Sequence, residues 1–179
     1  MTENRDNLSI YCNEDNPPSC CAIERDFTIP PSLYLTNVED IKKLHCTWDE
    51  KCNEDGSWWC MDEGGMAYST YDVSDELHAY VQQFFEFDVI VNYQLIHGQI
   101  PVHTDYARSL CWNYIIDTGG QHPDTRFWND EGTEIVERFD CKLHTWYQVN
   151  VTNKHDVSNI ERFRIALTVF ALDPEVTTK

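Results

Sequence analysis

The fold of this chain is decided by a run near its end, Arg162-Phe163-Arg164-Ile165-Ala166-Leu167-Thr168-Val169. Bulky apolar residues occupy every second position, and a period of two is typical of a strand with one face on a core. The same period recurs in the runs 89–95, 110–117 and 147–151. Turn signals separate the runs: Gly98, Gly119-Gly120, Asn129-Asp130-Glu131-Gly132 and Thr152-Asn153-Lys154. Short strands at this spacing predict a mainly β fold, an antiparallel sandwich or barrel.

Two short helices are predicted ahead of these strands. Asn37 can cap a helix that runs through Leu44. Ser74 can cap a second helix that ends near Phe85, and its apolar stripe consists of Leu77, Tyr80, Val81 and Phe84. We expect both helices to pack on the outside of one sheet. The pattern shows no domain boundary, so we expect one domain over 1–179 with a β core at about 87–172.

Composition narrows the classes of function. The chain has 179 residues, 13% of them aromatic, which a disordered chain would not carry. With 31 acidic and 13 basic residues the net charge is −18, and such a surface repels nucleic acid and anionic lipid. No apolar run has membrane-spanning length, and the N-terminus lacks the apolar core of a signal peptide. These features predict a cytoplasmic protein with no nucleic-acid or membrane partner.

Cysteines gather in an N-terminal arm that extends to about residue 65 and looks irregular up to about residue 30. Six of the eight cysteines fall in the first 60 residues, and Cys12-Asn13-Glu14-Asp15 recurs as Cys52-Asn53-Glu54-Asp55. A structural metal site or a disulfide would be the functional interpretation. C-x2-C pairs are absent and cytosolic disulfides are rare, so reduced thiols are favoured.

Three residues in the second half form a candidate metal site. His103-Thr104-Asp105 is an H-x-D motif, and His155 follows fifty residues after Asp105. Side chains at i and i+2 of a strand point to one face, so His103 and Asp105 can converge on one ion. Two imidazoles and one carboxylate can occupy one face of an octahedral iron(II) ion and leave the opposite face open.

Arginines near this motif are candidates for holding an anion. Arg164 lies on a strand whose other face is wholly apolar, and a charged residue on the inner face of such a strand needs a partner. A bound carboxylate or an internal acidic residue could be that partner. Arg162 is the alternative anchor, and Arg108 could reach the same pocket from the neighbouring strand.

The stretch from Ile100 to Phe170 resembles the core of the iron(II)/2-oxoglutarate-dependent oxygenases, especially their aspartyl/asparaginyl and prolyl hydroxylase-like branches. The resemblance is carried by the H-x-D motif, by His155-Asp156-Val157, by Asp117-Thr118-Gly119-Gly120 and by Arg164 with the strand after it. It implies a double-stranded β-helix, the jelly-roll or cupin-like fold. It also implies that His103, Asp105 and His155 bind catalytic iron and that Arg164 binds the distal carboxylate of 2-oxoglutarate.

One departure concerns the cosubstrate. Many members of the family have Ser or Thr two residues after the arginine, where this chain has Ala166. Tyr93, Asn113 or Thr168 could supply the missing hydrogen bond, with Arg108 as a further cosubstrate contact. The resemblance does not extend to the N-terminal 86 residues.

The resemblance implies hydroxylation of an amino acid, either free or within a peptide, with O2 as co-reactant. A cupin-like metalloenzyme that does not use 2-oxoglutarate is one alternative, and it would need the metal ligands but not Arg164. A non-catalytic jelly-roll binding module is the other.

Overall fold

The structure is a computed structural model, which describes residues 22–25, 28–47, 68–105 and 108–171. The helical elements are a short 3-10 helix η2 (Pro31–Leu33), α1 (Val38–Ile41) and α2 (Asp75–Gln82). The strands are β1 (Ala22–Arg25), β2 (Tyr68–Asp72), β3 (Ile90–Ile96), β4 (Ile100–His103), β5 (Leu110–Asp117), β6 (Asp124–Trp128), β7 (Ile135–Asp140), β8 (Trp146–Asn150), β9 (His155–Ser158) and β10 (Arg164–Phe170). Over these ranges the structure contains no helix long and apolar enough to cross a membrane.

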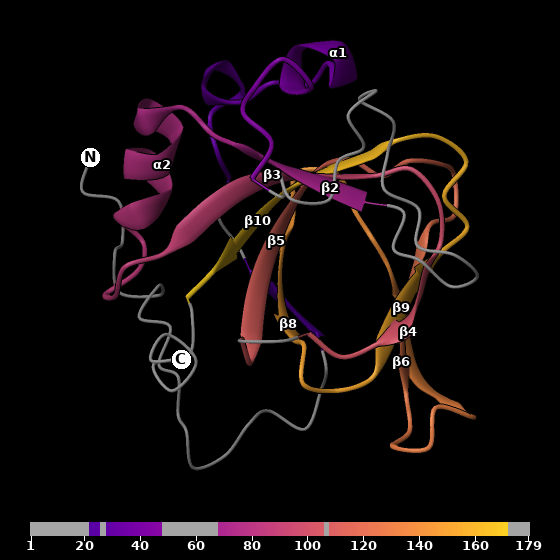
Figure 1. The fold of residues 1–179 in the computed structure, drawn as a ribbon. Helices are drawn as coiled ribbons and strands as arrows, with labels where there is room; N and C mark the ends of the chain where they lie inside the picture. Colours follow the sequence, from indigo (N-terminus) through magenta and orange to yellow (C-terminus); the bar gives the residue numbers. More distant parts are fainter. Residues whose placement is uncertain (1–21, 26–27, 48–67, 106–107, 172–179) are drawn as a thin grey trace.

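The strands form two antiparallel sheets that face each other (Figure 1). The larger sheet has six strands in the order β1-β8-β5-β10-β3-β2, and the smaller has four in the order β4-β9-β6-β7. Most neighbours in this order are far apart in sequence, as in a jelly roll, and only the pairs β2–β3 and β6–β7 are consecutive along the chain. The predicted mainly β, double-stranded β-helix fold is confirmed.

Both predicted helices are present, with the predicted caps. The Asn37 side chain accepts hydrogen bonds from the backbone N–H groups of Glu39 and Asp40, and Ser74 Oγ accepts one from the N–H of Leu77. The first helix ends at Ile41, before the predicted Leu44, because the next turn tightens into i→i+3 hydrogen bonds.

The helices cover the outer face of the larger sheet, as predicted (Figure 1). Its core cluster joins helix residues such as Leu77 and Val81 to one face of β3, β5 and β10. A second cluster lies between the two sheets and includes Ile115 from β5, Ala166 from β10 and Phe127 from β6. Strands β5 and β10 therefore send alternate residues to two different cores, which explains why they are buried on both faces.

Some strands lie where the sequence analysis placed none. Strand β1 falls in the stretch predicted to be irregular, and it pairs with β8. Strands β2, β6 and β7 were not predicted either. The repeated Cys-Asn-Glu-Asp segments lie outside the described residues. Among the cysteines that the structure describes, Cys111 and Cys141 are buried free thiols.

Candidate metal centre

Two histidines lie side by side on neighbouring strands of the smaller sheet. His103 at the end of β4 pairs directly with His155 at the start of β9, and their ring centroids are 4.3 Å apart. Each Nδ1 lies at hydrogen-bonding distance from a carbonyl two residues earlier, 2.7 Å for Pro101 and 2.9 Å for Asn153. A carbonyl oxygen can only accept, so each Nδ1 carries the proton. In the neutral form, the lone pair of each ring then lies on Nε2, where it can bind a metal.

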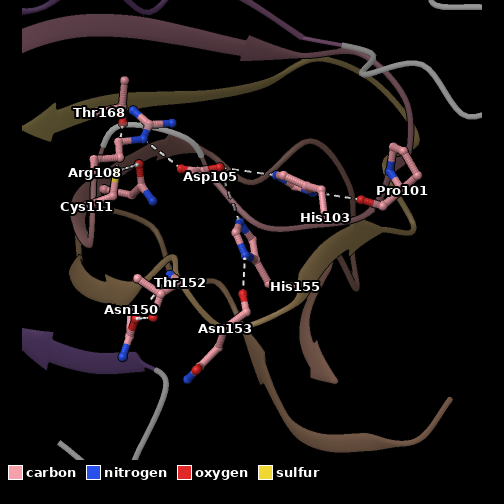
Figure 2. Close-up of polar contacts among 11 residues, drawn as sticks. Pro101, His103, Asp105, Arg108, Cys111, Asn150, Thr152, Asn153, His155 and Thr168 are labelled. Carbon is pink, nitrogen blue, oxygen red and sulfur yellow. Dashed lines mark hydrogen bonds and ion pairs between the residues drawn. The ribbon is translucent and has the colours of Figure 1, made fainter. Parts of the chain in front are cut away.

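Asp105 completes the group (Figure 2). Its Oδ1 lies 3.3 Å from His103 Nε2 and 3.9 Å from His155 Nε2. One ligand atom from each of the three residues lies within 4.8 Å of the others. Strand β4 ends at His103, so Asp105 is placed by a loop rather than by the strand geometry that we expected. A hydrogen bond from its backbone N–H to the carbonyl of Val151, 3.0 Å long, fixes that loop.

The protonation states suit a divalent cation. Burial, and then the neighbouring His103, lower the pKa of His155 below its ordinary value. Burial alone would raise the pKa of Asp105, but the contact with His103 and the charge of Arg108 outweigh it, so the pKa of Asp105 is lowered. A neutral imidazole and an ionised carboxylate are the forms that bind metal, so the residues fit an iron(II) ion.

Arg164, at the start of β10 in the larger sheet, lines the same pocket. The residue is only 4% exposed, and its Nη1 donates to the hydroxyl of Thr125 at 3.3 Å. Among the described residues, its Nε has no hydrogen-bond partner and no carboxylate forms an ion pair with it. A buried guanidinium without an acid is costly unless an anion binds it. Its strand neighbour Ile165 faces the helix-side core, as the period of two predicts.

The pocket lies between the sheets and holds the metal-site residues and Arg164 together. Its polar lining also includes Tyr68, Gln94, Arg108, Asn113, Thr125 and Tyr147. The apolar part of the lining consists of Ile96, Ile100, Cys111, Phe139, Val149, Val151 and Val157. The site can thus take a small anion beside a metal in a pocket that combines these polar groups with apolar walls.

Two of the residues predicted for cosubstrate binding lie elsewhere. Tyr93 faces the helix-side core, where its hydroxyl accepts a hydrogen bond of 2.7 Å from the backbone N–H of Leu35, so we correct its assignment. Arg162 precedes β10, is 64% exposed at its side chain and pairs with Asp117 at 2.9 Å. It therefore cannot replace Arg164 in the pocket.

The other predicted residues lie at or near the pocket. Asn113 lines it. Arg108 lines it too, but its Nε already donates to Asp105. The hydroxyl of Thr168 lies 3.0 Å from Cys111 Sγ.

Thr125 is the residue that sequence reasoning missed. It lies on β6, to which we assigned no strand, and it supplies the hydroxyl beside Arg164. A signal was present in the sequence, because Thr125 and Phe127 are two positions apart, the spacing of residues on one face of a strand. Both residues are buried in the structure. The charged Arg126 between them obscured the pattern, although its side chain lies on the other face and pairs with Asp156.

Comparisons with known proteins bear on the fold. No protein-family model matches the chain, and no curated protein does either. A prolyl hydroxylase from Trichoplax adhaerens, solved with a peptide fragment of the hypoxia inducible factor oxygen degradation domain, is 10% identical over 88% of this chain and 87% of its own, with a TM-score of 0.59. A prolyl-4-hydroxylase from Pseudomonas putida is 12% identical over 85% of this chain and 92% of its own, with a TM-score of 0.52.

An oxalate decarboxylase from Lactobacillus farciminis, in complex with formate, is 16% identical with a TM-score of 0.39; the match covers 58% of this chain and only 28% of the decarboxylase. The two hydroxylase structures share the double-stranded β-helix with this chain, and at such low identities the likeness shows the fold alone.

Proposed function

We propose that this protein is an iron(II)- and 2-oxoglutarate-dependent oxygenase that hydroxylates an amino acid, either free or within a peptide. One observation carries the proposal: a buried arginine with no acidic partner among the described residues lines the pocket that holds two histidines and a carboxylate. The metal site alone would fit many metalloenzymes. Arg164 adds a fixed position for a second anion, which a 2-oxo dicarboxylate requires.

Each residue has a distinct role in the proposal. His103, Asp105 and His155 hold the metal, and Arg164 binds the distal carboxylate with help from the hydroxyl of Thr125. With iron(II) bound, one atom of O2 enters the substrate C–H bond and the other enters succinate, while carbon dioxide leaves the cosubstrate. The apolar walls of the pocket exclude water from this reaction.

Support for a peptide substrate comes from the fold. The Trichoplax prolyl hydroxylase was solved with a bound peptide fragment, and its fold matches most of this chain. A free amino acid would use the same chemistry at the metal. Free amino acids and peptides are therefore both candidates for the substrate.

The experiment combines metal binding with cosubstrate turnover. Anaerobic protein with iron(II) and 2-oxoglutarate should give a weak charge-transfer band in the visible, and admission of air should give succinate. His155→Ala should lose the iron and the band while the protein stays folded, because a ligand at the pocket does not hold the core. Iron binding without any band or consumption of 2-oxoglutarate would favour the cupin-like alternative.

A further inference from the structure

Among the described residues, Arg108 forms the shortest side-chain contact with the metal-site carboxylate. Its Nε lies 2.7 Å from Asp105 Oδ2, while Asp105 Oδ1 faces the two histidines. Resting on the metal site of the proposed function, we infer that Arg108 is a positioning residue: it holds Asp105 so that the metal receives one carboxylate oxygen and not two.

The position of Asp105 explains why it needs such a partner. The residue lies beyond the end of β4, so no strand pairing orients its side chain. Its backbone is fixed to Val151, but that hydrogen bond leaves the carboxyl group free to rotate. The contact with Arg108 restrains this rotation, because a hydrogen bond between two charged groups is about twice as strong as a neutral one.

Arg108 is itself held in place. Its guanidinium lies over the ring of Phe170, 4.4 Å from the ring centroid, at the end of β10. The side chain is mostly buried, with 17% exposed. An unbroken series of contacts thus connects Phe170 to Arg108, to Asp105 and to the two histidines (Figure 2 shows the part from Arg108 inward).

The number of ligand atoms decides what the site can do. An octahedral ion has six positions, and two histidines with one carboxylate oxygen leave three of them open. A chelating 2-oxo acid would need two of these and O2 would need the third. A carboxylate that bound through both oxygens would take one open position and leave too few. By engaging Oδ2, Arg108 keeps all three positions available.

Two variants and a matched control test this inference. Arg108→Met removes the donor and keeps the length, and Arg108→Lys keeps the charge but loses the planar fork. Arg126→Met is the control, because Arg126 pairs with Asp156, the residue after His155, on the opposite face of the same sheet. The probe is cobalt(II), whose absorption reports its coordination, titrated without 2-oxoglutarate.

We expect Arg108→Met to weaken cobalt(II) binding about tenfold or more and to change the cobalt(II) spectrum, as is usual for a residue that orients a ligand. Arg108→Lys should lie between Arg108→Met and the wild type. Arg126→Met should keep the wild-type affinity and spectrum while its thermal midpoint falls. If Arg108→Met does not fold, the Lys variant carries the same comparison.

Several results would overturn the inference. One is an Arg108 variant that binds cobalt(II) with the wild-type affinity and spectrum. A second is an equal effect of Arg108→Met and Arg126→Met, which would indicate general destabilisation. A third is a loss confined to 2-oxoglutarate affinity, which would make Arg108 a direct cosubstrate contact. If wild-type protein binds cobalt(II) but never consumes 2-oxoglutarate, the proposed function fails while the comparison of variants still decides the role of Arg108.

Discussion

Gly119 packs directly against the backbone of Arg164. A Cβ atom at Gly119 would lie 2.8 Å from both the Cβ and the backbone nitrogen of Arg164, closer than real Cβ contacts allow. Gly119 also has a φ of +80°, and its carbonyl accepts hydrogen bonds of 2.9 Å from the backbone N–H groups of Glu161 and Arg162. The turn after β5 therefore sets the position from which Arg164 reaches the pocket.

Gly119→Ala should displace Arg164. The added methyl group clashes with the start of β10, and a positive φ costs a non-glycine residue about 1–2 kcal/mol. We expect 2-oxoglutarate binding to weaken about tenfold or more while iron(II) still binds, measured by titration of the charge-transfer band. Gly120→Ala is the control, because its Cβ would meet mainly the flexible side chain of Glu161 at 3.2 Å. Equal effects of the two substitutions would contradict this role for Gly119.

Thr125→Val should weaken 2-oxoglutarate binding less than Gly119→Ala does. The change keeps the shape of the side chain but removes the hydroxyl that accepts from Arg164 at 3.3 Å in a buried place. Loss of one such partner costs about 1–3 kcal/mol, so cosubstrate affinity should fall about fivefold or more while the metal affinity stays the same. Calorimetric titration of the metal-loaded protein under anaerobic conditions measures both. Unchanged 2-oxoglutarate affinity would mean that Thr125 does not help to place Arg164.

Tyr93→Phe should affect stability but not the cosubstrate. The hydroxyl accepts from the backbone N–H of Leu35 on the helix side of β3, away from the pocket. Its loss leaves that N–H without its partner, so the free energy of unfolding should fall by about 1 kcal/mol. Urea denaturation measures this change. A drop in 2-oxoglutarate affinity without a drop in stability would restore Tyr93 to the site.

The metal-free protein should lose stability as the pH falls below neutrality. Burial and, as the second cause, the neighbouring His103 lower the pKa of His155 in the folded state. As the pH falls, this imidazole is therefore protonated in the unfolded chain before it is protonated in the folded protein, near its ordinary pKa of about 6.5. The free energy of unfolding should therefore decrease as the pH falls from about 6.5 toward the lowered pKa of the folded protein.

His155→Gln isolates this contribution. Burial also lowers the pKa of His97, but His97 is present in both proteins and cancels in the comparison. In urea denaturation with a chelator at about pH 7.5 and about pH 5.5, the variant should lose less stability on acidification than the wild type. An equal or larger loss would show that His155 is not the buried neutral imidazole described above.

The sequence was sufficient to predict residues whose chemistry does not depend on neighbours. His103, Asp105 and His155 stood out as metal-ligand types, and Arg164 as a charge on an otherwise apolar strand. The strands that send residues to two cores, such as β5 and β10, had the clearest period of two. These predictions needed only side-chain type and spacing.

Prediction was harder where charges are neutralised across strands. Strand β6 was missed because Arg126 interrupts its apolar residues, yet Asp156 on β9 pairs with it. The direction in which Tyr93 points follows from the packing of α1 and α2, which a period of two cannot assign to one face or the other. Arg108 pairs with Asp105 through a side-chain contact that no sequence pattern specifies.

We propose that Arg164 binds the carboxylate of a cosubstrate beside the metal. The most direct measurement is the 2-oxoglutarate affinity of Arg164→Lys against Arg162→Lys, with iron(II) bound and oxygen excluded. Loss of the fork at Arg164 should cost roughly 1.5–3 kcal/mol, which is tenfold or more in affinity, while iron(II) binding is retained. Arg162→Lys should bind like the wild type, because Arg162 is exposed and pairs with Asp117. Wild-type affinity in Arg164→Lys, or a larger loss in Arg162→Lys, would contradict the account.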